Sequence, residues 1–306
     1  MTTTMATQAT TTLTTWLNRL RFVLAVALLW AGLHFVVGFA LPRGIDRAFV
    51  LAASPLAGLL TIFVLWLGAA AAVLITGTRD RRLPLIVLGV ALALWVGEGG
   101  RAGGTMDDWL VFCNNLPGPP TGVPYWKLIA DYVYLAVALT GAWVISTRLA
   151  GGVPASETPG DTLARAFALR VPAAERRQGL SALLTTVVVA AIAVYILAGP
   201  GLGATYRGQV YFAVGVGLFA GVFVAQQLVK TRDPLWFWPA PLVLGVVGLI
   251  VAGVQPGLGL QGYALNNLPA WGLSRALPLE MVGAGLVGAL WMLHAPSTDT
   301  ARDAGR

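Results

Sequence analysis

The sequence predicts an all-α polytopic membrane protein with about eight transmembrane helices, arranged as two parallel tandem four-helix repeats. Of the 306 residues, 57% are hydrophobic and only 11% are charged, whereas a soluble domain carries about a quarter charged residues. The chain contains eight apolar stretches, and most are long enough to cross a bilayer. Short polar motifs also recur in the same order in its two halves. These three observations exclude a disordered chain, a disulfide scaffold and an ordinary cytosolic enzyme.

The first predicted helix follows a Thr-rich segment, residues 1–18, that lacks a core pattern and is expected to be a disordered tail. Arg19 and Arg21 precede an apolar run from Phe22 to Leu41. A signal peptide has an apolar core of roughly 7 to 15 residues, which is shorter than this run. We therefore interpret the run as a membrane helix that stays in the protein.

Seven further apolar stretches follow the first one. They are expected at Phe49–Ile75, Leu83–Val96, Ile129–Ile145, Leu180–Leu197, Val210–Val229, Leu235–Val254 and Ala276–His294. The third helix is short, because its apolar part spans only about 21 Å at 1.5 Å per residue. It either extends toward Gly100, which places Glu98 at the membrane edge, or it is held by contacts with the rest of the protein.

The distribution of basic residues predicts the orientation. If the N-terminus, the C-terminus and the loops after the second, fourth and sixth helices share one side, that side holds 14 of the 20 lysine and arginine residues, leaving six opposite. The positive-inside rule then places both termini in the cytoplasm of a multi-pass protein of the inner (plasma) membrane. Residues 149–177 form a cytoplasmic linker and residues 296–306 a cytoplasmic tail. The net charge of +7 therefore reflects topology and contact with the lipid bilayer, and no nucleic-acid partner is expected.

An internal repeat relates the two halves. The tripeptide Thr-Arg-Asp occurs at residues 78–80 and again at 231–233, and Asn-Asn-Leu-Pro occurs at 114–117 and again at 266–269. The two offsets, 153 and 152 residues, are nearly equal. This pattern predicts a four-helix unit at 19–148 and a duplicate at 178–295. Because four is an even number, the two units have the same orientation in the membrane.

Composition limits the cofactors. Cys113 is the single cysteine, so an internal disulfide or a multi-cysteine metal site is excluded. The two histidines, His34 and His294, fall at different predicted depths, about 15 Å apart at 1.5 Å per residue. They cannot ligate one haem or metal ion together, so no haem or metal is expected on this chain, while a quinone is a possible ligand.

Four residues are candidates for catalysis. His34 is either a histidine bonded within the bundle or a functional group. Asp131 and Glu280 begin matched helices, where each either caps its helix or contributes to a proton or cation site at the pseudo-symmetric centre. Cys113, on the predicted outer side, either accepts a sulfane sulfur or bridges to a partner, or packs as a small apolar residue.

The outer loops at 98–127 and 255–276 are the densest polar regions and are predicted to carry the active surface. Asp107 and Asp108, with Glu98 nearby, either hold a cation or form a solvated loop. The asparagines either contact substrate or make turns before proline. The candidates for substrate binding are Arg101, Asp107, Asp108, Asn114, Asn115, Asn266, Asn267 and Arg275.

Two motifs resemble the DoxX/DoxD-like family of four-helix membrane proteins. One is Arg-Leu-Arg-Phe at 19–22 followed by Leu-Leu-Trp-Ala-Gly-Leu-His at 28–34, and the other is Trp-Lys-Leu-Ile-Ala-Asp-Tyr at 126–132. The resemblance covers residues 19–148, and residues 178–295 look like a diverged copy. The family usually has a lysine where this chain has His34 or Phe35. The resemblance implies a membrane subunit of a thiosulfate:quinone-type oxidoreductase.

Three functions follow as hypotheses. The first is a membrane subunit of a quinone-linked oxidoreductase, whose partner subunit supplies the redox centre because this chain has few ligands of its own. The second is a small-solute or ion transporter, which would use the interface between the repeats as its pathway. The third is a non-enzymatic membrane scaffold or assembly factor, in agreement with the few polar residues expected in the core.

Overall fold

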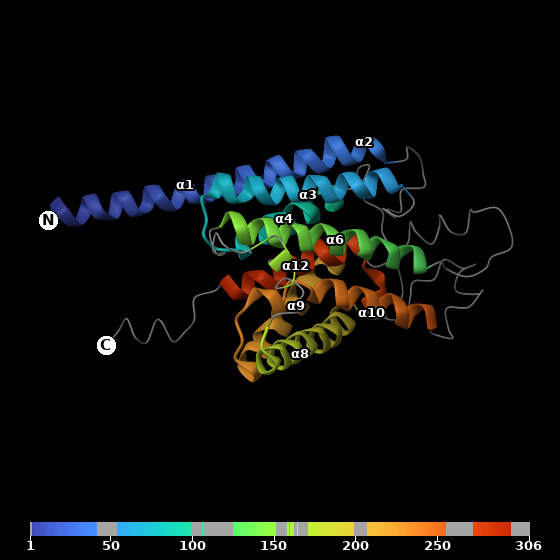
Figure 1. Ribbon diagram of the computed structural model, residues 1–306. Coiled ribbons are helices and arrows are strands. Elements are labelled where there is room, and N and C mark those ends of the chain that lie inside the picture. The colour runs from blue at the N-terminus through green and yellow to red at the C-terminus, as the bar shows by residue number, and fades with distance from the viewer. Residues whose placement is uncertain are drawn as a thin grey trace.

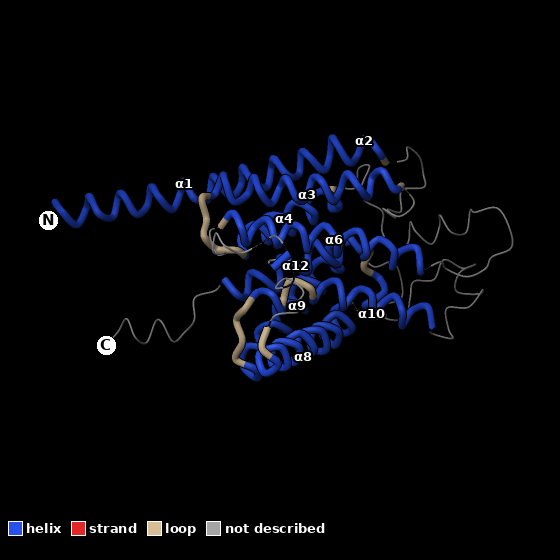
Figure 2. The backbone as a smooth tube through the Cα atoms, in the orientation of Figure 1, coloured by secondary structure: helices blue, strands red, loops and turns tan. Residues whose placement is uncertain are grey.

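The described part of the chain is all-helical and has no strand. The computed structural model describes residues 2–41, 54–98, 106, 125–150, 158, 160–161, 164, 171–198, 207–254 and 272–294. Its main helices are α1 (Thr2–Gly32), α3 (Pro55–Thr76), α4 (Arg82–Gly97), α6 (Tyr125–Leu149), α8 (Ala173–Leu197), α9 (Arg207–Val229), α10 (Ala240–Val254) and α12 (Pro278–His294). They pack side by side as one bundle (Figures 1 and 2), which confirms the all-α prediction.

Six helices are long and apolar enough to cross a membrane by length and composition. They are Thr15–Ala40, Pro55–Thr76, Leu128–Leu149, Ala173–Leu197, Arg207–Val229 and Pro234–Val254. These helices make the chain a multi-pass membrane protein. Two further apolar helices, Arg82–Gly97 and Pro278–Leu293, are shorter than a usual span.

The first helix begins earlier than the sequence suggests. Residues 2–18, expected as a disordered tail, continue into the membrane helix as the first part of α1. No glycine or proline interrupts the chain before Gly32, so no helix-breaking residue separates the Thr-rich segment from the apolar run. Beyond Gly32 the helix continues as a π-helix, Leu33–Val37, and a short α2, Gly38–Ala40.

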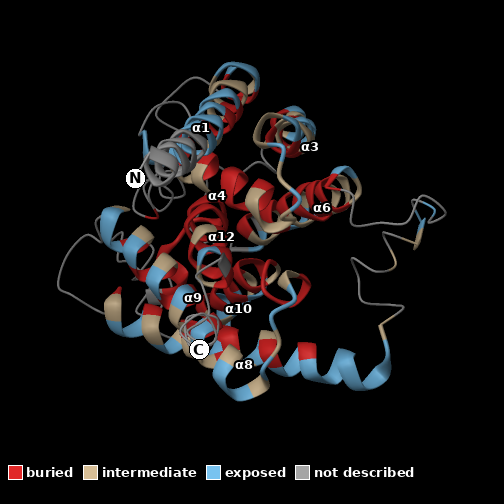
Figure 3. Ribbon diagram, turned by 90° about the vertical axis from the view of Figure 1, so that its left-hand side faces the viewer, coloured by how far each residue is buried: buried red, intermediate tan, exposed pale blue. Residues whose placement is uncertain are grey.

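The two short helices form the centre of the bundle. Helix α4 has 16 residues and α12 has 17, so they span about 24 and 26 Å at 1.5 Å per residue. They pack against each other, and α1, α3 and α6 also contact α4, while α6, α9 and α10 contact α12. Figure 3 shows both as predominantly buried ribbons between the outer helices. Contacts with the rest of the protein therefore hold the short third helix, which was one of the two interpretations of its short apolar run.

Helices α3 and α9 end in the same way. Gly77, which follows α3, has φ of 59°, and Lys230, which follows α9, has φ of 56°. The N–H group of each bonds to the carbonyl four residues earlier, at 2.9 and 3.1 Å. This left-handed cap satisfies one of the carbonyls that a helix end leaves without an intrahelical partner. The cap is unstrained at Gly77, whereas Lys230 adopts a conformation that is uncommon for a residue with a Cβ atom.

An aspartate follows each of these two caps. Asp80 Oδ1 accepts a hydrogen bond from the N–H of Arg82, and Asp233 Oδ1 accepts one from the N–H of Leu235, both at 3.0 Å. The Arg82 guanidinium also bonds to Asp80, at 2.8 and 2.9 Å, and donates to the carbonyl of Leu293. Arg82 therefore joins the start of α4 to the last turn of α12 and satisfies a carbonyl at the end of the second short helix.

Glycines allow two helix pairs to approach closely. A Cβ atom on Gly288 of α12 would collide with the backbone oxygen of Gly215 on α9, and one on Gly221 of α9 would collide with the backbone oxygen of Thr186 on α8. Small residues at such contacts let helix backbones meet, which is how helices commonly associate inside lipid. The α8–α9–α12 layer is therefore packed backbone to backbone.

Candidate functional site

Buried charged side chains gather at one end of the bundle, where α6, α9 and α12 begin and α4 ends. We name it the Glu280 end. Asp131 on α6 is 0% exposed, Glu280 on α12 is 1% exposed and Arg275, in a 3₁₀ turn before α12, is 6% exposed. Arg207 at the start of α9 has a side chain that is 19% exposed. Two acids and two arginines are thus withdrawn from solvent in one region, which is costly without compensating contacts.

Glu280 combines two roles. Its Oε2 accepts a hydrogen bond from the N–H of Leu277 at 3.0 Å, which is half of a capping box at the start of α12. Its Oε1 lies 3.4 Å from Nε of Arg207. The capping interpretation of Glu280 is therefore confirmed, and the same carboxylate also forms an ion pair with another helix.

Arg207 and Tyr211 complete the end of α4. Arg207 Nη1 donates to the carbonyl of Val96 at 3.1 Å and to that of Gly97 at 3.4 Å. One turn further along α9, the Tyr211 hydroxyl donates to the carbonyl of Ala93 at 3.2 Å. A short helix that ends at membrane depth must satisfy its last carbonyls within the protein, and two side chains of α9 supply the donors.

Asp131 does not cap α6. The helix begins at Tyr125, so Asp131 lies in its second turn, beyond the first turn in which the helix dipole is effective. The next residue, Tyr132, is 3% exposed, and its hydroxyl makes no hydrogen bond with any described residue. Tyr132 also packs on Gly245 of α10, where a Cβ atom would collide with the phenol.

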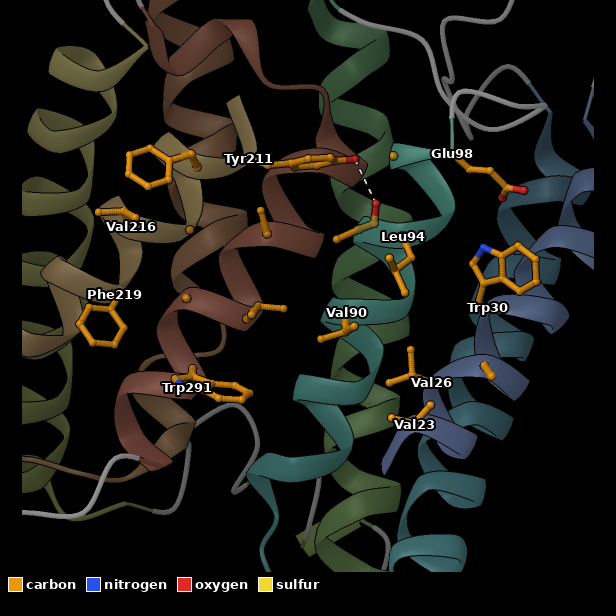
Figure 4. Close-up of a pocket in the computed structure, with 18 residues that line it drawn as sticks. Val23, Val26, Trp30, Val90, Leu94, Glu98, Tyr211, Val216, Phe219 and Trp291 are labelled. Carbon is orange, nitrogen blue, oxygen red and sulfur yellow. Dashed lines mark hydrogen bonds between the residues drawn. The ribbon is translucent and has the colours of Figure 1, made fainter. Parts of the chain in front are cut away.

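An open groove of about 1180 Å³ runs along the bundle between α1 and α4 on one side and α9 and α12 on the other. Figure 4 shows Val23, Val26 and Trp30 of α1 facing Val216 and Phe219 of α9 across it. Several of its wall residues are large, apolar and exposed, namely Val23, Leu94, Phe212, Val216, Phe219 and Trp291. The groove therefore presents an apolar surface on the flank of the bundle that faces lipid in a membrane.

The charged and hydroxyl-bearing side chains of the groove lie at its Glu280 end. Glu98, the residue after α4, and Tyr211 line it there. Oε2 of Glu98 lies 3.2 Å from Nδ1 of His34 on the π-helix. The ring of His34 packs on that of Trp30 at a tilt of 32°, with ring centroids 5.2 Å apart. The groove thus has a long apolar part and a short polar end.

A second open groove, of about 930 Å³, lies between α3, α6 and α10. Its lining is apolar apart from Trp66, Tyr132 and Thr140. The Trp66 indole N–H donates to the carbonyl of Ala138 at 3.0 Å, which fixes α3 against α6. None of the side chains that line this groove carries a charge, in contrast to the first groove.

Most of the predicted loop candidates lie outside the described residues. These are Arg101, Asp107, Asp108, Cys113, Asn114, Asn115, Asn266 and Asn267. The side chain of His294 is also outside the description. Of the candidates that are described, Glu280 pairs with Arg207 and His34 contacts Glu98, while Asp131 and Arg275 are buried in the protein rather than displayed on a surface. Among the described residues, no group of three or more histidine, cysteine, aspartate or glutamate side chains could hold a metal ion.

Sequence analysis missed several of the residues that build this region. The sequence pointed to Arg207 only as one of the six basic residues on the side predicted to face away from the cytoplasm. It did not point to Tyr211 at all. A signal existed for Arg207, because basic residues concentrate on the cytoplasmic side and this arginine directly precedes an apolar helix on the other side. The pairing of His34 with Glu98, 64 residues apart, left no local signal.

No protein-family model matches this chain, and no curated protein or solved structure is significantly similar to it.

Proposed function

We propose that the chain crosses the plasma membrane eight times, with both termini in the cytoplasm, as a tandem duplication of a four-helix unit. The matched helix ends support the duplication. Gly77 and Lys230 adopt the same left-handed conformation directly before the two Thr-Arg-Asp sequences, at the ends of α3 and α9. Asp80 and Asp233 then make the same bond to the N–H two residues later. The repeated residues therefore perform the same local tasks.

The helix packing supports the same duplication. If α1, α3, α4 and α6 correspond to α8, α9, α10 and α12, the contact of α3 with α6 corresponds to that of α9 with α12. The contact of α4 with α12 then corresponds to that of α10 with α6. The two grooves correspond as well, because one involves α4, α9 and α12 and the other α10, α3 and α6. The third helix of each unit thus packs against the fourth helix of the other unit, as expected for parallel repeats that share a core.

Within this architecture, we propose that the protein is the membrane subunit of a quinone-linked oxidoreductase. The observation that carries the proposal is the lipid-facing groove, which is apolar along most of its length and polar at the end near Glu98. A quinone has two matching parts, a long apolar tail and a small headgroup ring with oxygen atoms. The resemblance to DoxX/DoxD-like proteins implies the same ligand class. A partner subunit supplies the electrons, and this chain supplies the binding site in the membrane.

Two glycines of α9 provide a matched test. Gly215 lines the groove, and a Cβ atom there meets its nearest neighbour, the Ala284 carbonyl oxygen, at an ordinary 3.6 Å. The variant Gly215→Leu therefore places a side chain in the groove without a backbone clash. Gly208 does not line the groove, and a Cβ atom there meets nothing within 4 Å. Both variants exchange a helical glycine for a residue of higher helix propensity, so they differ chiefly in the groove.

The experiment is a purification in mild detergent, followed by solvent extraction, chromatography of the extract for quinones, and mass spectrometry of co-purifying proteins. Wild type and Gly208→Leu are expected to retain quinone and a redox partner, whereas Gly215→Leu is expected to lose the quinone. The proposal is overturned if wild type carries no quinone, or if the Gly215→Leu protein carries as much of it as the Gly208→Leu protein.

A specific observation also favours a transporter as a second candidate. The two central helices span only about 24 and 26 Å, so the middle of the bundle is thinner than its wall, and Asp131, Glu280, Arg207 and Arg275 are located at one end of it. Flux of small anions or cations into liposomes that contain the protein would support this function. Liposomes that remain tight to all tested ions would exclude it and leave the scaffold hypothesis as the alternative to the oxidoreductase subunit.

A further inference from the structure

A local departure from α-helical geometry lies beside the polar end of the first groove, next to its lining residues Trp30 and Glu98. His34 lies on the π-helix Leu33–Val37, which interrupts the run between α1 and α2. Single π-helical turns inside α-helices are rare and occur frequently at functional sites. The π-helical turn therefore indicates that His34, which it carries, is a candidate functional residue.

The surroundings of His34 hold its ring in place but leave it accessible. Its ring centroid lies 5.2 Å from that of Trp30, at an interplanar angle of 32°, and 4.8 Å from that of Phe35, edge to face at 75°. Nδ1 lies 3.2 Å from Oε2 of Glu98, and the two side chains are 32% and 35% exposed. Trp30 and Glu98 line the groove (Figure 4), so His34 touches two of its lining residues.

Few charges face this histidine. The π-helix packs against α1, α2, α3 and α4. Helices α2 and α3 contain no charged residue, and α1 carries its arginines, Arg19 and Arg21, about four turns from His34. On α4 the charged groups are Arg82, at the opposite end, and Glu98. From α9, Arg207 bonds to the carbonyls of α4 directly before Glu98. Among the described residues, the charge that meets the imidazole is therefore Glu98.

The contact with Glu98 decides which ring nitrogen remains for a ligand. An ionised carboxylate can only accept hydrogen bonds, so Nδ1 of His34 carries the hydrogen in this contact. Among the described residues, the hydrogen bond of the His34 ring is the one at Nδ1, and none bonds to Nε2. In the neutral ring Nε2 then bears a lone pair and accepts, whereas in the protonated ring it bears a hydrogen and donates. Glu98 thus fixes the ring so that a change of protonation reverses the role of one defined atom.

We propose that Nε2 of His34 bonds to an oxygen of the quinone headgroup, and that protonation of His34 strengthens the binding of the oxidised form in the groove. This inference rests on the proposed function. The reduced form has a hydroxyl group, which donates to the neutral ring and accepts from the protonated ring, so it bonds in both states. The oxidised form has a carbonyl group, which only accepts, so it bonds to the protonated ring. Between the two bound states the ring takes up one proton from water, and no electron transfer is part of this binding step.

The test is calorimetric titration of a short-chain benzoquinone and, anaerobically, of its reduced form into the detergent-purified protein. Histidines ordinarily change their charge between pH 5 and 8, so the titrations are made at about pH 5.5 and 8.5. We expect the quinone to bind about tenfold more tightly at the lower pH, as one charge-assisted hydrogen bond allows. The affinity of the reduced form should change clearly less between the two pH values, because its hydroxyl bonds to either state of the ring.

Variants separate the contribution of His34 from that of the groove. His34→Gln offers both a donor and an acceptor at every pH, so its affinities for the two forms should not depend on pH. His294→Gln, which alters the second histidine of the chain, should keep the wild-type dependence and is the matched control. Glu98→Gln should weaken the pH dependence of quinone binding, because an amide no longer fixes the hydrogen on Nδ1.

The outcomes distinguish this inference from the proposed function. If Gly215→Leu abolishes the binding of both forms but His34→Gln keeps the wild-type pH dependence, the inference about His34 is overturned and the groove remains the binding site. If neither form binds the wild-type protein at either pH, both proposals fail. Size-exclusion profiles of each variant, compared with wild type, check that the protein is folded.

Discussion

Replacing Gly288 by alanine is expected to push α9 and α12 apart. A Cβ atom at Gly288 would collide with the backbone oxygen of Gly215 and would also lie 2.8 Å from its carbonyl carbon and 3.0 Å from its Cα atom. All three atoms belong to the backbone of a helix, so no side-chain rotation can relieve the contact. In the same substitution at the facing glycine, Gly215→Ala, the added Cβ atom meets only the Ala284 carbonyl oxygen, at 3.6 Å. The two facing glycines should therefore respond differently to the same change.

The magnitude follows from two opposing contributions. An alanine in a helix is more favourable than a glycine by about 1 kcal/mol, and this gain applies at both positions. Overpacking costs about 1–3 kcal/mol, and a clash with backbone belongs to the upper part of that range. Gly288→Ala should thus lose about 1–2 kcal/mol net, or about 3–6 °C in Tm. Gly215→Ala should keep the Tm of wild type or raise it slightly.

The assay is thermal unfolding of the three proteins in the same detergent, followed by tryptophan fluorescence and by the monodisperse fraction that remains after heating. Gly288→Ala and Gly215→Ala have the same composition, so their comparison isolates position. Equal stability of the two variants, or a lower Tm for Gly215→Ala, would refute the close approach of α9 and α12 described here.

Three further predictions concern the helix ends and the orientation. Arg207→Met removes the charge that faces the buried Glu280 and should lower the free energy of unfolding by about 3–5 kcal/mol. Glu280→Gln keeps a cap on α12 and should lower it clearly less, so similar Tm values for the two variants would contradict this. Arg82→Ala should lose about 1–2 kcal/mol and increase hydrogen exchange in the last turn of α12, and unchanged exchange there would show that this contact does not hold the helix end. Cys113 should react with an impermeant maleimide in intact cells, while Ser156→Cys combined with Cys113→Ser should react only after permeabilisation, and the reverse pattern would mean the opposite orientation.

The buried charges illustrate where sequence reasoning stops. The sequence identified Asp131 and Glu280 as matched acids at matched helix starts, and capping was one of two interpretations for both. Glu280 does cap α12, by accepting from the N–H of Leu277. Asp131 does not cap α6, because that helix begins at Tyr125, six residues earlier, and helix boundaries are the least certain part of a sequence-based assignment. The same error of boundary explains why α1 contains residues expected to be disordered.

The sequence by itself determined the helical class of this protein, its membrane character and the shortness of its third helix. Lipid offers no hydrogen-bonding partners, so each apolar run must satisfy its backbone within one helix, and this rule acts locally along the chain. The repeated Thr-Arg-Asp sequences are likewise local, and the aspartate that ends each of them, Asp80 or Asp233, accepts a hydrogen bond from the N–H two residues later.

Only the tertiary structure decided which side chains meet. His34 contacts Glu98 across 64 residues, and Arg207 reaches Val96 across 111. In a chain whose helices are apolar on every side, hydropathy does not distinguish the face that meets lipid from the face that meets another helix. That choice depends on where small residues let backbones approach, as at Gly288 and Gly215. The central position of α4 and α12, and with it the groove, follows from this packing.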